Sequence, residues 1–324
     1  MARNIAAAGY ESVAGSIYAP PRISAKIVQN YHLCSITAQL ANSNFFSDDE
    51  VFCGSKVIYG VEQDLNMFAS ERDINESPET LSGAPANTAS LTVCNQERFR
   101  WKLSNYDRRI MCDNFSQWEA SLQRLISRNI IRLVDAYSIP KIVASAPAYN
   151  VGTHAGKLTG SINLGDQGSN ALDGNTKAGF ESLIYSLVEA GQEAGMMCGE
   201  GEVGVEGDAS APVIVIPSKL QRYAMSVLKE LNTCCSDQNA FITGRLGHIQ
   251  GMPVYVTSYL APVDIGSGLR APVMLVDPKQ VLHAFDVVTN KWFEGEFEDY
   301  LVGEFAWETH VFNPDGVIVA QSKV

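Results

Sequence analysis

The chain has 324 residues, 46% of them hydrophobic, so it is long enough for two domains and can bury a substantial core. Its formal net charge of −12 argues against nucleic-acid binding over the whole surface, because phosphate contacts require clustered Lys and Arg. The seven cysteines are odd in number and include no CxxC pair, which argues against a metal framework and indicates thiols in a reducing compartment. No apolar run has the length of a signal peptide or a membrane span, so we expect a soluble, cytosolic product.

The first third of the chain predicts an extended arm and then a long hairpin. Residues 1 to about 30 are rich in Gly, Ala, Ser and Pro, which is typical of an arm rather than a packed element. Residues 51–64 alternate as a strand does, the polar stretch 71–90 has few large apolar side chains, and residues 90–104 return as a second strand. A loop this long suggests a purpose outside the domain that carries it.

Three helices are expected farther along the chain. Ser116 and Glu119 form a capping-box pattern before apolar residues at helical spacing, and Pro140 is expected to end this long helix. A second helix is predicted from Thr176 to about Ala194, and a third is predicted to begin at the N-cap Ser218.

Strands alternate with these helices. The runs at 212–217 and 271–278 predict buried strands, and the alternating residues after 283 predict antiparallel strands. Together these elements indicate the α+β fold class.

The stretch GRLGHIQGMPVYVTS, residues 244–258, resembles a phosphate-binding loop at first sight. A dinucleotide site requires a helix after the glycines, whereas Pro253 and the β-branched residues behind it predict a strand. Gly244, Gly247 and Gly251 are therefore interpreted as a structural turn or β-bulge between two strands.

The other candidate motifs are also weak. GTHAGKLT, residues 152–159, has only three residues between its glycines and lacks Ser or Thr after Lys157, so it is not a Walker A loop. The acidic loop at 198–210 could hold Ca²⁺ but lacks the EF-hand pattern, and a solvated loop is the simpler interpretation. The five histidines are scattered, so we expect no catalytic residue, no metal site and no cofactor.

The order of these elements resembles the major capsid proteins of tailed double-stranded DNA phages, which have the Hong Kong 97-type coat fold. The resemblance rests on the sequence pattern PVIVIPSKLQRYAMSVLKEL followed by GRLGHIQGMPVYVTSYLAP. This pattern predicts a strand, then a helix, then a glycine turn that leads into another strand. The resemblance assigns residues 1–44 to an N-terminal arm and residues 62–108 to an extended loop over a neighbouring subunit. It assigns residues 151–279 to an axial domain. The peripheral domain, which contains a long spine helix, comprises residues 45–61, 109–150 and 280–324.

This resemblance implies a structural protein rather than an enzyme. It implies self-assembly through pentamers and hexamers into an icosahedral shell in the virion, built in the host cytoplasm around double-stranded DNA without sequence-specific binding. It also implies a portal protein and a separate scaffolding protein as partners, with a decoration protein as a further possible one and no membrane. An encapsulin-like nanocompartment shell is the close alternative. A soluble enzyme or ligand-binding protein that uses loops 144–175 and 198–210 is the alternative from another class.

Basic residues gather on the returning strand of the hairpin. They are Arg98, Arg100, Lys102, Arg108 and Arg109. A solvated strand face is one interpretation. The resemblance favours contact with acidic residues of a neighbouring subunit, because complementary charge sets register across interfaces.

Overall fold

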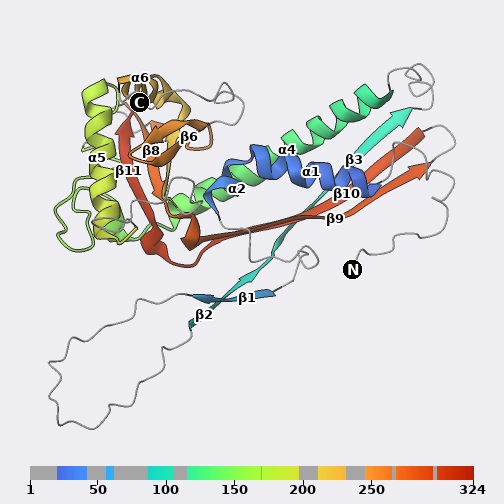
Figure 1. Ribbon diagram of the computed structural model, residues 1–324, viewed down its shortest axis with the longest axis horizontal. Coiled ribbons are helices and arrows are strands. Elements are labelled where there is room, and N and C mark those ends of the chain that lie inside the picture. Colours follow the sequence, from blue (N-terminus) through green and yellow to red (C-terminus); the bar gives the residue numbers. More distant parts are fainter. Residues whose placement is uncertain are drawn as a thin grey trace, which may run out of the picture.

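The computed structural model describes residues 20–41, 56–61, 87–104, 115–168, 170–196, 211–230, 245–264, 268–294 and 298–324. Helices and sheets are mixed, which confirms the predicted α+β class. The long helix α4 (Phe115–Ala144) runs between a three-stranded sheet and a six-stranded sheet (Figure 1). None of the helices in the described ranges is long and apolar enough to cross a membrane.

The six-stranded sheet is buried on both faces. Its strand order is β11 (Val317–Lys323), β8 (Leu269–Val276), β4 (Val213–Pro217), β6 (Met252–Thr257) and β5 (Arg245–Ile249), with β7 (Val263–Asp264) paired to β8. β4 and β6 are parallel, and the other pairs are antiparallel. Ile214 lies in the cluster on one face and Val215 in the cluster on the other. Burial on both faces explains the continuous apolar runs and confirms the buried strands predicted at 212–217 and 271–278.

Two helices cover one face of this sheet. α5 (Lys177–Glu193) begins after Thr176, whose hydroxyl accepts a hydrogen bond from the N–H of Gly179, so the second predicted helix is confirmed. α6 (Gln221–Glu230) follows the 3-10 turn η3 (Ser218–Leu220). The prediction that Ser218 is an N-cap is wrong, because this residue opens η3 and no side chain caps the turn. The chain tightens there because Leu220, at the end of the turn, is fully buried.

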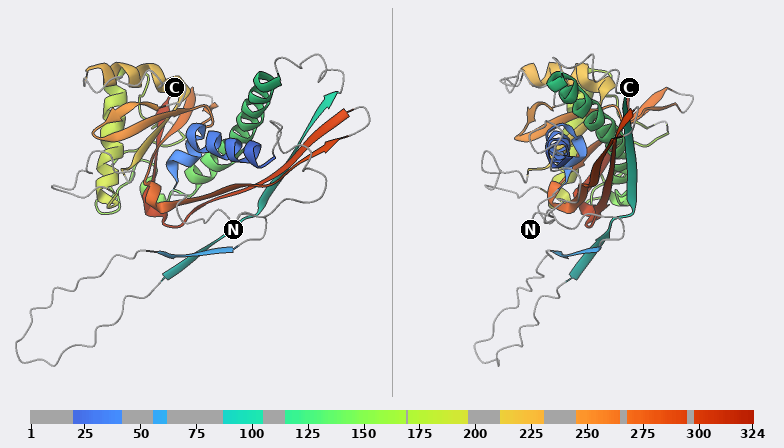
Figure 2. Two further views of the ribbon diagram at one scale, coloured as in Figure 1. Left: turned by 45° about the vertical axis from the view of Figure 1, so that its right-hand side comes forward. Right: turned by 90° about the vertical axis from the view of Figure 1, so that its right-hand side faces the viewer.

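The three-stranded sheet is antiparallel, in the order β3 (Asn95–Ser104), β10 (Glu298–Val311) and β9 (Val281–Glu294). α4 and the N-terminal helix α1 (Pro20–Cys34) lie on one of its faces (Figure 2). The predicted antiparallel strands near the C-terminus are therefore present. β11 lies in the segment 280–324, which the resemblance assigns to the peripheral domain, but it pairs with β8 in the six-stranded sheet. Its residues 317–320 are all buried, so both of its faces are covered.

The expected extended arm is helical from Pro20 onward. α1 buries Ile27 and Tyr31 completely, and the short helix α2 (Ile36–Leu40) follows it directly. The expectation of an unpacked segment up to about residue 30 is wrong for this part. Ile27 and Tyr31 lie four residues apart, which places them on one face of a helix, and proline is favoured in a first helical turn.

α4 continues through Pro140, where the sequence predicts its end. A proline inside a helix removes one backbone hydrogen bond and usually kinks or ends the helix. Here Ile139 and Ile142 on either side of Pro140 are fully buried in the cluster against the six-stranded sheet. Tertiary packing therefore outweighs the local cost of the proline.

The predicted hairpin is present at its base but divided between two sheets. β1 (Lys56–Val61) pairs with β2 (Asn87–Thr92) in a sheet of only two strands, and its tip, residues 62–86, lies outside the described residues. The returning strand predicted at 90–104 is in fact two strands, because β3 leaves β1 and pairs with β10. Val93, between β2 and β3, is buried against β9 and β10, which fixes this change of partner.

Candidate interaction surface

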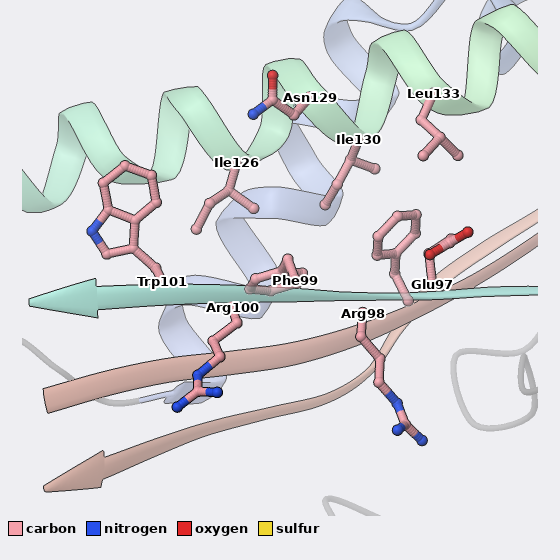
Figure 3. Close-up of a pocket in the computed structure, with 10 residues that line it drawn as sticks. Glu97, Arg98, Phe99, Arg100, Trp101, Ile126, Asn129, Ile130 and Leu133 are labelled. Carbon is pink, nitrogen blue, oxygen red and sulfur yellow. The ribbon is translucent and has the colours of Figure 1, made fainter. Parts of the chain in front are cut away.

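β3 forms the outer edge of the three-stranded sheet. It pairs with β10 on one side, and no other described strand pairs with its second edge. Its side chains alternate between two surfaces: Phe99 and Trp101 point toward α4, whereas Arg98 and Arg100 point away from it (Figure 3). An exposed edge of this length is a template for pairing with another strand.

A trough of about 320 Å³ separates β3 from α4 (Figure 3). It is lined by Glu97, Arg98, Phe99, Arg100, Trp101, Ile126, Asn129, Ile130, Leu133 and Phe305. Phe99 lies over Gly303, where an added Cβ would be 2.1 Å from the Phe99 ring. Gly303 therefore provides the space in which the ring forms part of the trough wall.

The trough continues along β3 toward Cys94. A second hollow shares Glu97 and Leu133 with the first and is also lined by Tyr137 and Trp307. Leu133 and Tyr137 are each 40% exposed, and Trp101 is 36% exposed. We call this continuous depression the β3–α4 trough. Its first part is mostly apolar and its second part is mixed, and it is bounded by β3, whose second edge pairs with no described strand.

The opposite surface of β3 is basic. Arg98 forms an ion pair with Glu304 on β10, with 3.1 Å between Nε and Oε1, and Gln96 donates a hydrogen bond to the same carboxylate. Because the Arg98 side chain is 79% exposed, this pair contributes less than about 1 kcal/mol to folding. The guanidinium of Arg100 lies 4.3 Å from the centre of the Tyr300 ring.

The structure thus brings three of the five predicted contact residues onto one strand. Arg98, Arg100 and Lys102 are exposed at period two on β3. Arg108 and Arg109 lie outside the described residues. Arg98 forms its ion pair with Glu304 of the same chain. Because the Arg98 side chain is 79% exposed, most of its surface is still open to solvent.

The glycine stretch forms a hairpin turn. β5 and β6 are joined by Gln250 and Gly251, whose φ angles are 51° and 80°, as in a type I′ turn. The register shifts between Arg245 and Gly247, which marks a bulge or irregularity in β5. Pro253 lies one residue before β6 begins to pair with β4, and Gly244 lies outside the described residues.

Replacement of Gly251 by valine is expected to lower the free energy of unfolding by about 1–2 kcal/mol. The cost arises because a β-branched residue is strained at positive φ, although open space surrounds the position. Urea denaturation measures the effect. Gly251→Asn is the matched control and is expected to lose less, because asparagine tolerates this conformation. Equal stability of the valine variant and wild type would contradict the assignment of the turn.

The loop with the GTHAGKLT stretch is fastened by its own charged groups. Lys157 forms a 2.6 Å ion pair with Asp315, which also accepts a hydrogen bond from the hydroxyl of Tyr149. Glu193 accepts hydrogen bonds from Thr159 and from the N–H of Leu158, and these bonds lower the pKa of Glu193. Lys157 therefore has a structural partner. Across the part of the chain that the structure describes, no three His, Cys, Asp or Glu side chains are grouped as metal ligands.

A buried polar chain joins α1 to the sheet and to α4. The hydroxyl of Tyr31 forms a 2.6 Å hydrogen bond with Nε2 of His283, and Nδ1 of His283 lies 2.8 Å from the hydroxyl of Thr309. That hydroxyl is 2.7 Å from the hydroxyl of Ser138 on α4. Burial lowers the pKa of His283 to about 3, so the imidazole is neutral near pH 7.

A buried carboxylate from α4 caps α2. Asp135 accepts hydrogen bonds from the hydroxyl of Ser35 at 2.6 Å and from the backbone N–H groups of Ile36 and Thr37. Burial raises the pKa of Asp135, and these hydrogen bonds partly oppose the change. Sequence reasoning identified neither Asp135 nor the His283 chain, because Ser35 lies 100 residues from Asp135 and Tyr31 lies 252 residues from His283.

The fold is similar to that of solved phage proteins. No protein-family model matches the chain, and no curated protein is similar to it. A chain of Mycobacterium phage Che8 has a TM-score of 0.51 at 13% identity, over 88% of this chain and 90% of that one. A chain from the capsid of cyanophage P-SCSP1u has a TM-score of 0.50 at 11% identity, over 89% of this chain and 88% of that one. These similarities confirm the predicted Hong Kong 97-like fold.

Proposed function

We propose that this chain is the major capsid subunit of a tailed double-stranded DNA phage, which self-assembles through pentamers and hexamers into an icosahedral shell. The observation that carries the proposal is a fold shared with a cyanophage capsid chain over about nine-tenths of both proteins. A likeness over this share of both chains extends well beyond one common motif.

The exposed apolar side chains of α4 support a role in which the subunit contacts neighbouring subunits. Leu125, Leu133 and Tyr137 are 46%, 40% and 40% exposed, and their spacing places them on one face of the helix. Exposed large apolar side chains that gather on one helix, as Leu133 and Tyr137 do beside the trough, are typical of an interaction site. The two-stranded β1–β2 sheet is also marginal alone and gains stability when another chain covers it.

The remaining roles follow from the proposed shell. The chain acts as a structural protein of the virion and not as an enzyme, it is assembled in the host cytoplasm, and it encloses DNA without reading its sequence. The net charge of −12 suits such a container, because a basic lining would immobilise the genome through phosphate contacts. A separate scaffolding protein and a portal protein are the partners that the proposal calls for, and a decoration protein is an optional further one. The segments 1–44, 62–108 and 151–279 keep their proposed roles as arm, extended loop and axial domain, apart from the differences described above.

Electron microscopy of the purified protein tests this function. We expect negative-stain images to show closed shells or capsomers. Small uniform particles under all assembly conditions would instead favour the enzyme or ligand-binding alternative, and shells that copurify with enclosed protein cargo would favour a nanocompartment.

Deletion of residues 71–86 is expected to abolish closed shells while the subunit remains folded. The deletion spares β1 and β2, which end and begin at Val61 and Asn87, but it removes the length with which the hairpin would reach a neighbour. Circular dichroism and thermal melting would verify folding, and microscopy would score the shells. Normal closed shells from a folded deletion variant would rule out the extended-loop assignment.

A further inference from the structure

We infer that Glu308 is a positioning residue that sets the direction in which the β1–β2 hairpin leaves the body of the subunit. The inference concerns contacts within one chain. It also deepens the proposed function, because the direction of the hairpin would decide where it meets another subunit. Only this effect on assembly rests on the proposed function.

β3 and β10 part at the base of the hairpin. Asn95 and Trp307 are the last pair of the β3–β10 ladder, and Glu308 is the next residue of β10. From there to Val311, β10 pairs with β9 and with no other described strand. On the other side of the fork, the chain before Asn95 passes through residues 93–94 into β2, which pairs with β1 (Figure 1). Glu308 therefore lies at the point where the hairpin departs.

The carboxylate of Glu308 connects the first residue of β3 to α4. Its Oε2 accepts a 3.0 Å hydrogen bond from Nδ2 of Asn95, and its Oε1 forms a 2.6 Å ion pair with Nζ of Lys141. The N–H of Thr309 also donates to Oε1, at 3.1 Å. The Glu308 side chain is only 6% exposed, so water hardly reaches it. A buried carboxylate is costly to leave without its partners, which favours one fixed arrangement of these groups.

Apolar contacts attach the hairpin to the body. Leu91 and Val93 are buried in a cluster with Leu282, Ala284 and Ala306. Apolar contacts are non-directional and permit small rotations, whereas a hydrogen bond has a preferred angle. β1 and β2 form a sheet of only two strands, which is marginal on its own. The apolar residues thus hold the hairpin in place, and the carboxylate sets its direction.

A small rotation at this joint has a large effect at the far end of β2. Asn87 lies eight residues before Asn95, so the arm between them is about 26 Å long at about 3.3 Å per residue. A rotation of about 10° would displace Asn87 by about 5 Å, roughly the spacing of neighbouring strands in a sheet. A displacement of this size is enough to misplace a contact with another subunit.

Distances between two spin labels test this role in the unassembled, full-length subunit. The labels are attached through a genetically encoded keto amino acid at Thr88 of β2 and at the exposed Arg128 of α4, so that the native cysteines stay untouched. We expect one narrow distance distribution in the wild-type background. Asn95→Ala separates the hairpin from the carboxylate but leaves the Lys141 ion pair in place, so this distribution is expected to become about twofold broader.

Further variants separate this connection from a general loss of contacts. Glu308→Ala is expected to broaden the distribution at least as much, and Asn95→Ala is expected to add little to it, because both changes break the same connection. Glu304→Ala is the matched control. It removes another carboxylate of β10 that bonds Gln96 and Arg98 within the ladder, and the width is expected to stay unchanged. Melting temperatures show that each variant is folded, and the half-buried Asn95 provides the milder test should Glu308→Ala fold poorly.

The outcomes distinguish this inference from the proposed function. A distribution as narrow as wild type in folded Asn95→Ala would overturn the inference, because the hairpin would then keep its direction without the carboxylate. Equal broadening in Glu304→Ala would also overturn it, because any lost contact of β3 would have the same effect. Where wild type forms shells, electron microscopy is expected to show a wider range of diameters for Asn95→Ala. Wild type that never assembles would reject the proposed function and leave the distance measurement valid.

Discussion

Acidification from pH 7 to pH 4 is expected to lower the free energy of unfolding by about 3 kcal/mol through His283 alone. Burial lowers the pKa of this imidazole from 6.5 to about 3, and the nearby His32 also lowers it. The folded protein thus binds this proton more weakly than the unfolded chain does. The stability that His283 provides is complete above pH 6.5 and is lost progressively as the pH falls toward 3.

The physical cause lies in the contacts of the ring. Nε2 of the neutral ring forms a hydrogen bond with the hydroxyl of Tyr31, and burial raises the pKa of Tyr31 well above its ordinary value, so this hydroxyl keeps its proton. Protonation would place a positive charge in a fully buried site, where burial disfavours the charged form. The result is a loss of the connection between α1 and the three-stranded sheet.

Urea denaturation at pH 7, 5.5 and 4 measures the effect in wild type and in His283→Gln. The glutamine side chain offers a donor and an acceptor but does not titrate, so the pH dependence of its variant is expected to be smaller by about 3 kcal/mol. Asp135 acts in the opposite direction, because its raised pKa adds stability as the pH falls, and it does so in both proteins. Identical pH dependence in the two proteins would show that His283 remains neutral or is exposed.

Replacement of Asp135 by alanine is expected to lower the free energy of unfolding by about 2–4 kcal/mol. The side chain is 2% exposed, and its loss leaves the Ser35 hydroxyl and the N–H groups of Ile36 and Thr37 without their acceptor. The N-terminal turn of α2 then loses its anchor on α4. Chemical denaturation at pH 7 measures the change.

Two further variants serve as controls for this loss of stability. Asp135→Asn keeps one acceptor oxygen in a side chain of the same shape, so it is expected to retain part of the stability. Asp173→Ala removes an exposed carboxylate and is expected to change stability by less than about 0.5 kcal/mol. A loss at Asp135 no larger than that at Asp173 would mean that the capping contact contributes nothing.

Elements whose signal is local were predictable from the sequence. The apolar face of α5 repeats at helical spacing and its cap Thr176 directly precedes it, so both ends could be read from neighbouring residues. The buried runs of β4 and β8 were equally clear. The basic residues of the returning strand likewise marked one surface of the candidate site.

Elements that depend on distant partners were not predictable. The split between β2 and β3 is set by β10, about 200 residues later, and the continuation of α4 past Pro140 is set by packing against the six-stranded sheet. The buried polar residues His283 and Asp135 find their partners in Tyr31 of α1 and in Ser35, the N-cap of α2. The trough forms only because α4 and β3 lie side by side. No local sequence pattern predicts this arrangement.

The helix α4 contributes to two separate cores. Its Ile126 and Ile130 pack under the three-stranded sheet, whereas Ile139 and Ile142 pack against the six-stranded sheet. One continuous rod therefore belongs to both halves, with no linker between them to stretch or bend. Neither half can melt without stripping side chains from a helix that the other half holds, so the two behave as one cooperative unit. In the proposed shell, a load on one half would pass along the helix axis to the other.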